Sequence, residues 1–264
     1  FIVFCINFAI ILMGAQLNFK LLDMINWKVF LFIFCLILIS IFTSIILGRI
    51  FKISKGLSLL IGVGNGICGS SAIAGVSSIL KSKKDDVGLS ISIINIIGVF
   101  GVFLVPSIIV YFQIDSTFSQ GMIIGGTIQA VGQVTAAGFI MGDEVGRLAT
   151  IIKMIRILML GPIMVIIAMI YNTNSNQKSV KNIFKIPSFI IGFIIISLLT
   201  NINLFSSEII NYIIIISKYS LIISMVAIGL QVSLSSIYTQ GIKVIFVSLV
   251  TFIIQIFICV QFVT

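Results

Sequence analysis

The residues from Gly62 to Gly75 read GVGNGICGSSAIAG, and those from Gly125 to Gly138 read GGTIQAVGQVTAAG. Both stretches interrupt segments that are otherwise apolar enough to be membrane helices. A helix broken at membrane depth frees backbone groups that cost several kcal/mol each when unpaired, so it persists only where protein, water or a ligand satisfies them. The two stretches therefore predict two broken or re-entrant elements, the kind of place where transporters bind their substrates. Close packing of neighbouring helices on glycine is the alternative explanation.

The composition indicates that lipid surrounds the chain. Of 264 residues, 59% are hydrophobic and 9% are charged, and the mean hydropathy is +1.31, more apolar surface than one soluble core can bury. Apolar segments of roughly the ~20 residues needed to span a bilayer fall at 1–17, 28–48, 56–80, 87–112, 119–141, 148–171, 187–203, 217–234 and 242–263. The expected fold class is an all-α polytopic membrane protein.

The domain organisation expected is a single transmembrane domain over residues 1–264. A polar loop at 172–186, rich in Asn, Ser, Gln and Lys, divides it into a first part, 1–171, and a second part, 187–264. The chain begins at Phe1, inside an apolar stretch and without an initiator methionine. We interpret it as a fragment that lacks its N-terminal part.

The net charge of +9 comes from basic residues scattered singly and in threes between apolar runs, so a nucleic-acid partner is not expected. Lys and Arg instead report topology, because they gather on one side of the membrane. If every segment crosses, six basic residues lie on each side; if the two glycine-rich segments turn back, nine face three. The bias favours two re-entrant elements that enter from opposite faces, with crossing discontinuous helices as the alternative.

The residue inventory argues against an enzyme. The chain has no histidine and only seven acids, which excludes a Ser-His-Asp arrangement and a histidine-rich metal centre. Its four cysteines, at positions 5, 35, 68 and 259, lie in apolar runs without metal or disulfide spacing. We expect no enzymatic activity, no cofactor and no metal.

A weak internal repeat is consistent with a transporter. The stretch Gly14 to Phe19 reads GAQLNF and Gly229 to Leu234 reads GLQVSL, and the same offset pairs Lys28 with Lys243. The two stretches would run in opposite directions, as in an inverted-topology repeat. Chance similarity between apolar sequences is the competing explanation.

Three motifs carry a resemblance to a known family. The runs Gly64 to Gly75 and Gly126 to Gly138, together with Ala149 to Pro162, resemble in order and spacing the bacterial sulfate exporter family. The resemblance implies a multi-pass inner-membrane protein of about ten helices, distantly similar to bile acid:sodium symporters and cation:proton antiporters. It also implies about two further helices before Phe1. Many members carry a histidine and an acid where this chain has Gln129 and Ala130.

Lys153 and Arg156 are the most informative charged residues. At i and i+3 they share one helix face, inside an apolar segment. They could extend toward Asp143 and Glu144 at the start of that helix and pair with them. Alternatively they bind an anion, with a bidentate contact from the Arg156 guanidinium and a single positive charge from the Lys153 ammonium. No acid lies in the middle of any segment, which favours an anionic substrate over a carboxylate-bound cation.

The function expected is secondary transport of a small inorganic or organic anion, first a sulfate-like oxyanion, across the bacterial inner membrane by alternating access. Its partners would be the anion, the lipid bilayer and further copies of the chain. Candidate substrate-binding residues are Asn65, Ser70, Ser71, Gln129, Gln133, Thr135, Lys153 and Arg156, and candidate backbone breaks are Gly64, Gly66, Gly69, Gly126 and Gly132. A channel or passive pore, and a non-transporting structural subunit, are the alternatives.

Overall fold

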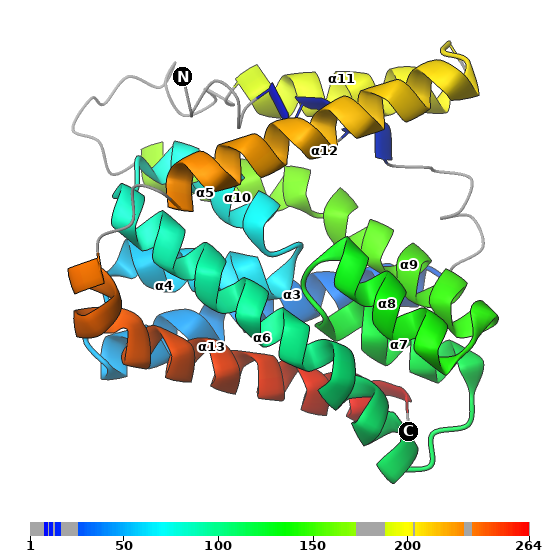
Figure 1. Ribbon diagram of the computed structural model, residues 1–264, viewed down its shortest axis with the longest axis horizontal. Helices are drawn as coiled ribbons and strands as arrows, with labels where there is room; N and C mark the ends of the chain where they lie inside the picture. The colour runs from blue at the N-terminus through cyan, green and yellow to red at the C-terminus, as the bar shows by residue number, and fades with distance from the viewer. Residues whose placement is uncertain are drawn as a thin grey trace.

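The computed structural model describes residues 8, 9, 11, 12, 14–16, 26–172, 188–202, 204–229 and 234–263. Their regular elements are all helices (Figure 1). In chain order they are η1 (Gly14–Gln16), α3 (Trp27–Ile50), α4 (Lys55–Gly66), α5 (Ser70–Leu80), α6 (Lys84–Tyr111), α7 (Thr117–Thr127), α8 (Val131–Met141), α9 (Asp143–Leu158), α10 (Leu160–Asn172), α11 (Ser188–Asn201), α12 (Ser207–Gly229) and α13 (Leu234–Val263). The all-α polytopic fold class is confirmed.

Four described stretches are long and apolar enough to cross a membrane: Trp27–Ile50, Lys84–Tyr111, Asp143–Tyr171 and Gln240–Val263. Some helices begin earlier than the hydropathy windows predict, because their first turns are polar. α9 starts at Asp143, where two acids occupy the positive N-terminal turn. α12 starts at Ser207, one residue after Ser206, whose hydroxyl accepts the Ile209 N–H at 3.4 Å.

Two predictions lie at least partly outside the described residues. Of the polar loop 172–186, only Asn172 is described, as the last residue of α10. In the proposed repeat, 17–19 and 230–233 are not described. The inverted repeat therefore stays a prediction.

Both glycine-rich segments are broken helices. α4 ends at Gly66 and α5 begins at Ser70, with Ile67, Cys68 and Gly69 between them. Gly69 has a φ of +69°, a conformation that residues with a Cβ rarely adopt. The second break, 128–130, lies between α7 and α8, and its end residues are extended, with ψ of 142° at Ile128 and 145° at Ala130.

The second pair of helices, α7 and α8, folds back on itself. Gly121 of α7 packs on Leu148 of α9 and Gly125 on Ile152, so α7 runs parallel to α9. α8 is joined to α9 through Gly142 alone and packs back along it. α7 and α8 are therefore antiparallel. In Figure 1 the pair α4 and α5 lies on the left and α7 and α8 on the right, each turning near the centre. This is the geometry expected of re-entrant elements that enter from opposite faces.

The predicted roles of four glycines need correction. Gly64 and Gly66 lie in the last turn of α4, Gly126 in the last turn of α7 and Gly132 in the first turn of α8, so they flank the breaks. Three of them allow close packing: a Cβ would meet Ile94 at Gly64, Ser40 at Gly66 and Cys259 at Gly126. A Cβ on Gly132 would meet nothing within 4 Å. Of the five, only Gly69 lies in a break itself.

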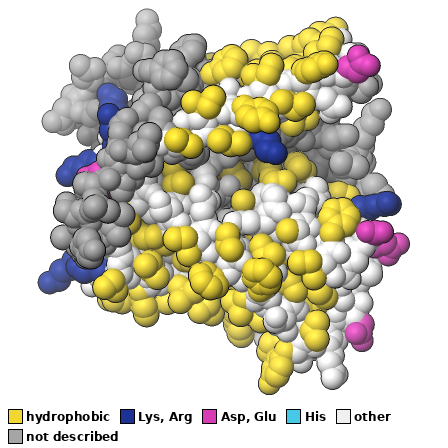
Figure 2. Space-filling view, viewed as in Figure 1, with side chains coloured by type: hydrophobic (Ala, Val, Ile, Leu, Met, Phe, Trp, Pro, Cys, Tyr) yellow, Lys and Arg dark blue, Asp and Glu magenta, His cyan; other side chains and the backbone are white. Residues whose placement is uncertain are grey.

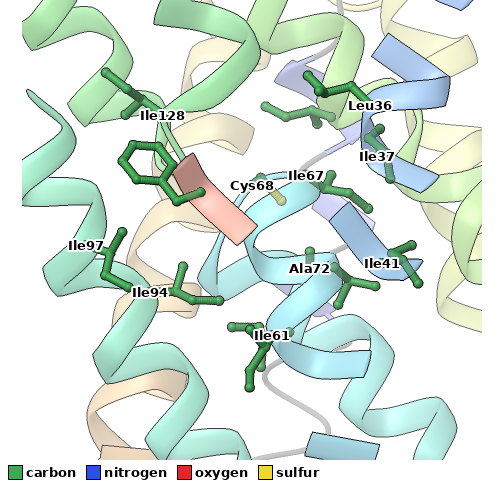
Figure 3. Packing of buried hydrophobic residues seen from close by; sticks show 14 of the residues in the cluster. Leu36, Ile37, Ile41, Ile61, Ile67, Cys68, Ala72, Ile94, Ile97 and Ile128 are labelled. Atoms are coloured by element: carbon green, nitrogen blue, oxygen red, sulfur yellow. The ribbon is translucent and has the colours of Figure 1, made fainter. Parts of the chain in front are cut away.

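The helices form two groups. α3 to α10 and α13 pack into one body, whose apolar core surrounds the first break; Figure 3 shows Ile61, Ile67, Ala72 and Ile94 within it. α11 and α12 each pack on η1, and the three lie along one side of that body (Figure 1). Many large apolar side chains on the outside are exposed, and Figure 2 shows them spread over the visible face, as suits a lipid surrounding.

Candidate functional site

Lys153, on α9, joins the two breaks. Its side chain is 0% exposed. The ammonium Nζ donates to the Ile67 carbonyl oxygen at 2.6 Å and to the Ile128 carbonyl oxygen at 2.9 Å. Ile67 belongs to the first break and Ile128 to the second, so the tips of the two folded-back pairs meet at one cation.

Arg156 lies one turn further along α9 and is also 0% exposed. Its Nε donates to the Gly66 carbonyl at 2.9 Å, and its Nη1 to the carbonyls of Gly125 at 3.1 Å and Ile128 at 2.9 Å. Its Nη2 donates to the Asn65 carbonyl at 2.5 Å. The last carbonyls of a helix have no partner within it. Arg156 therefore supplies donors to the C-terminal ends of both α4 and α7.

The interpretation that Asp143 and Glu144 pair with these cations is not supported by the geometry. Both acids are exposed in the first turn of α9. Within the described part of the chain, Lys153 and Arg156 donate their hydrogen bonds to backbone carbonyls. Each helix C-terminus carries about half a negative charge, so the two ends offset about one of the two positive charges. A net positive centre is left in the core.

A buried amide network lies beside the cations. Asn65 Nδ2 donates to Ser248 Oγ at 2.9 Å, and Gln129 Nε2 donates to Asn65 Oδ1 at 3.0 Å. Gln255 Nε2 donates to the Asn65 backbone carbonyl at 3.3 Å. Asn65, Gln129, Ser248 and Gln255 are all 0% exposed. The network ties both breaks to α13.

A second polar contact joins the N-terminal ends of α5 and α8. Ser70 Oγ donates to Asn95 Oδ1 at 3.0 Å, and Gln133 Nε2 donates to the Asn95 backbone carbonyl at 3.2 Å. The Gln133 side-chain oxygen accepts the Ala130 N–H at 3.2 Å. Asn95, on α6, therefore holds the two helix starts together. Ser70 and Gln133 are partly exposed, unlike the cations beneath them.

The remaining predicted ligands lie at the same helix starts but have local partners. Thr135 Oγ1 bonds to carbonyls of its own helix, Val131 at 3.1 Å and Gly132 at 2.9 Å. The Ser71 hydroxyl lies against the buried thiol of Cys68. The structure thus brings Asn65, Gln129, Lys153 and Arg156 into one buried cluster, with Ser70, Ser71, Gln133 and Thr135 along its α5 and α8 side.

Three residues of this site were not predicted: Asn95, Ser248 and Gln255. Each is a polar residue inside a long apolar helix, Asn95 on α6 and the other two on α13. Amide side chains in membrane segments are uncommon and usually bond across helices. That signal was present in the sequence, although it does not name a partner.

The arrangement suits a small anion better than a cation. The N–H groups of a first helical turn have no partner within the helix, and the helix end carries about half a positive charge. Two such ends, α5 and α8, adjoin a buried centre with two cations. Figure 2 shows that the surface is hollowed between α12 and the layer of α6 and α8 below it.

Comparison with known proteins places this chain among bacterial membrane proteins. It is 32% identical to a UPF0324 membrane protein of Staphylococcus epidermidis over 246 residues, covering 93% of this chain and 74% of the relative. It is also 32% identical to relatives from Bartonella henselae, covering 94% and 72%, and from Clostridium perfringens, covering 90% and 72%. No solved structure matches the chain. The family model described as Conserved hypothetical protein 698 matches residues 2–248, and the chain therefore belongs to this family of UPF0324 membrane proteins.

Proposed function

We propose that the protein is a secondary transporter that moves a small inorganic or organic anion across the inner membrane by alternating access. A sulfate-like tetrahedral oxyanion is the leading substrate class. The observation that carries the proposal is the net positive charge of Lys153 and Arg156, both 0% exposed, at the point where four helix ends meet. A centre of this kind is costly to bury, and an anion bound beside it would offset its charge.

The anion is proposed to bind at the N-terminal ends of α5 and α8. Backbone N–H groups there, with Ser70, Ser71 and Gln133, would donate to its oxygens. Lys153 and Arg156 would act mainly through their charge, because the bonds described above already engage their nitrogens. This differs from the sequence-based expectation that the Arg156 guanidinium contacts the anion directly with two hydrogen bonds.

Alternating access is proposed to move one helix group against the other. The body of α3 to α10 and α13 carries both breaks, whereas η1, α11 and α12 form a separate layer beside it. A rocking motion between the two layers would open the site to one side and then to the other.

Burial of the centre favours a transporter over a passive pore. A pore keeps a continuous water-filled path, whereas Asn65, Gln129 and both cations are 0% exposed here. That is what an occluded state of a transporter would look like. Proton coupling at Gln129 and Ala130 is not part of the proposal, since neither residue titrates.

Uptake into proteoliposomes tests the proposal. The purified protein is reconstituted, and labelled sulfate and labelled phosphate are each offered with and without a proton or sodium gradient. A transporter predicts saturable uptake that speeds up when the same unlabelled anion is loaded inside. Uptake that rises linearly without such counterflow would indicate a pore. Absence of any anion flux from a folded protein would favour a structural subunit.

A further inference from the structure

Two buried amide oxygens of the network lack a donor among the described residues: Gln255 Oε1 on α13, and Gln129 Oε1 beside the start of α8. Among the described residues, Gln129 Oε1 has no hydrogen-bond partner although the side chain is 0% exposed. An unpaired polar atom in a protein interior commonly marks a place where a water or a ligand binds, or a functional group. Gln129 is the residue before the N-cap of α8, so its oxygen lies at the proposed anion site.

The network fixes which end of the Gln129 amide faces outward. Asn65 Nδ2 lies 3.3 Å from the Ile61 carbonyl, which only accepts, so the Asn65 amide nitrogen must face that way. Its oxygen then faces Gln129 at 3.0 Å, and only the Gln129 amide nitrogen can donate to it. Gln129 Oε1 is left pointing away from the network, as an acceptor.

This oxygen lies between the starts of two helices. A Cβ placed on Gly98 of α6 would be 2.9 Å from Gln129 Oε1 and would clash with Gln133 Oε1, so both amide oxygens lie against the same glycine. A Cβ placed on Gly69, the N-cap of α5, would be 3.5 Å from the Gln129 Cβ. Gln129 is thus in contact with the first break while it precedes the helix after the second.

The site therefore combines donors with an acceptor. N–H groups and positive charge attract an anion, whereas Gln129 Oε1 repels an oxygen that carries no proton. From this geometry we infer that the preferred substrate is an anion that also carries a hydrogen-bond donor, such as a monoprotonated oxyanion or a hydroxycarboxylate. Fully deprotonated sulfate would be a poor ligand. The inference rests on the proposed function and refines its substrate class.

The Gln129 oxygen favours anions that carry a hydroxyl over anions that do not. A buried acceptor that meets a substrate hydroxyl gains a hydrogen bond, and the same acceptor stays unpaired against an analogue without one. At about pH 8, phosphate is chiefly the hydrogen phosphate dianion, which matches sulfate in charge and tetrahedral shape. Apart from the central atom, the two differ by a single proton, so a change in their relative affinity when the acceptor is removed reports the effect of that acceptor.

The test is a binding competition on the full chain in detergent at about pH 8, with labelled phosphate as the probe and sulfate as the competitor. We expect hydrogen phosphate to bind about 10- to 100-fold more tightly than sulfate. Glycolate is expected to bind more tightly than acetate, because glycolate carries an additional hydroxyl. Gln129→Met keeps the side-chain length and removes the acceptor, together with the donor to Asn65 Oδ1. In this variant the preference should fall to within about threefold.

Gln120→Met is the matched control, because Gln120 lies on α7 and donates to the Ile114 carbonyl at 2.7 Å, away from the break. It should keep the preference. Equal or tighter sulfate binding in the unaltered protein overturns the inference, as does a preference that survives in folded Gln129→Met. Saturable sulfate transport without discrimination would leave the proposed function standing and remove only this inference. Binding of none of the four anions would remove both.

Discussion

Lys153 and Arg156 donate to the same acceptor, the carbonyl oxygen of Ile128, at 2.9 Å each. Two like charges are thus held one helical turn apart in a buried place. The arrangement is tolerable because each cation also bonds carbonyls at the tip of α4, and two helix C-termini face the pair. The cations therefore have a structural role, which is to donate hydrogen bonds to the carbonyls at both breaks. The helix C-termini do not fully offset their positive charge.

The structural role predicts a large loss of stability in Arg156→Met. The carbonyls of Gly66 and Gly125 would lose the partner described here, and each unpaired group costs about 1–3 kcal/mol. We expect the free energy of unfolding in detergent to fall by about 2–5 kcal/mol. The loss of stability is measured by thermal unfolding, followed by the fluorescence of an added dye instead of tryptophan. Arg147→Met, an exposed position on the same helix, should change stability little. Equal stability of the two variants would contradict the capping role.

The contact between α7 and α13 predicts a specific cross-link. A Cβ on Gly126 would lie 3.0 Å from the sulfur of Cys259, close enough for a disulfide. Gly126→Cys should therefore form an intramolecular disulfide under mild oxidation, detected as a thiol count lower than that of the reduced protein. Gly132→Cys, where a Cβ meets nothing within 4 Å, should stay reduced. Failure of the first variant to cross-link would argue against the position of α7.

The close approach at Gly98 predicts sensitivity to a single methyl group. Gly98→Ala would press on the amide oxygens of Gln129 and Gln133 and displace them from the helix starts. We expect the free energy of unfolding to drop by about 1–3 kcal/mol and anion affinity to fall about tenfold. Gly56→Ala, where a Cβ meets nothing within 4 Å, is the matched control. Unchanged affinity in folded Gly98→Ala would show that the two glutamines do not shape the site.

Much of the fold could be predicted because the bilayer constrains it strongly. Apolar length marked the spans. Dense glycine together with an amide side chain, Asn in the first stretch and Gln in the second, marked both breaks, since buried amides inside an apolar run are uncommon. The count of Lys and Arg favoured two elements that turn back, and the pairing of α7 and α8 with α9 agrees with it. Helix starts were predicted less well, because the polar residues of a first turn lower the mean hydropathy of the window that contains them.

The site could be predicted only in part. Lys153 and Arg156 stand out as charges in an apolar helix, but their partners are backbone carbonyls up to 91 residues away. A carbonyl has no sequence signature, so the sequence left acids and an anion as the visible candidates. Asn95 was missed for a related reason, because a lone amide in a long helix does not reveal that it joins Ser70 to Gln133.

The charge of Lys153 provides the most direct test of the anion transporter. In Lys153→Gln, an amide nitrogen can still donate to the carbonyls at the breaks while the positive charge is removed. The account predicts a folded protein whose affinity for labelled phosphate falls about tenfold or more, whereas Lys218→Gln, an exposed position on α12, keeps its affinity. Anion affinity and saturable uptake that are unchanged in folded Lys153→Gln would contradict the account and leave the buried cations with a structural role alone.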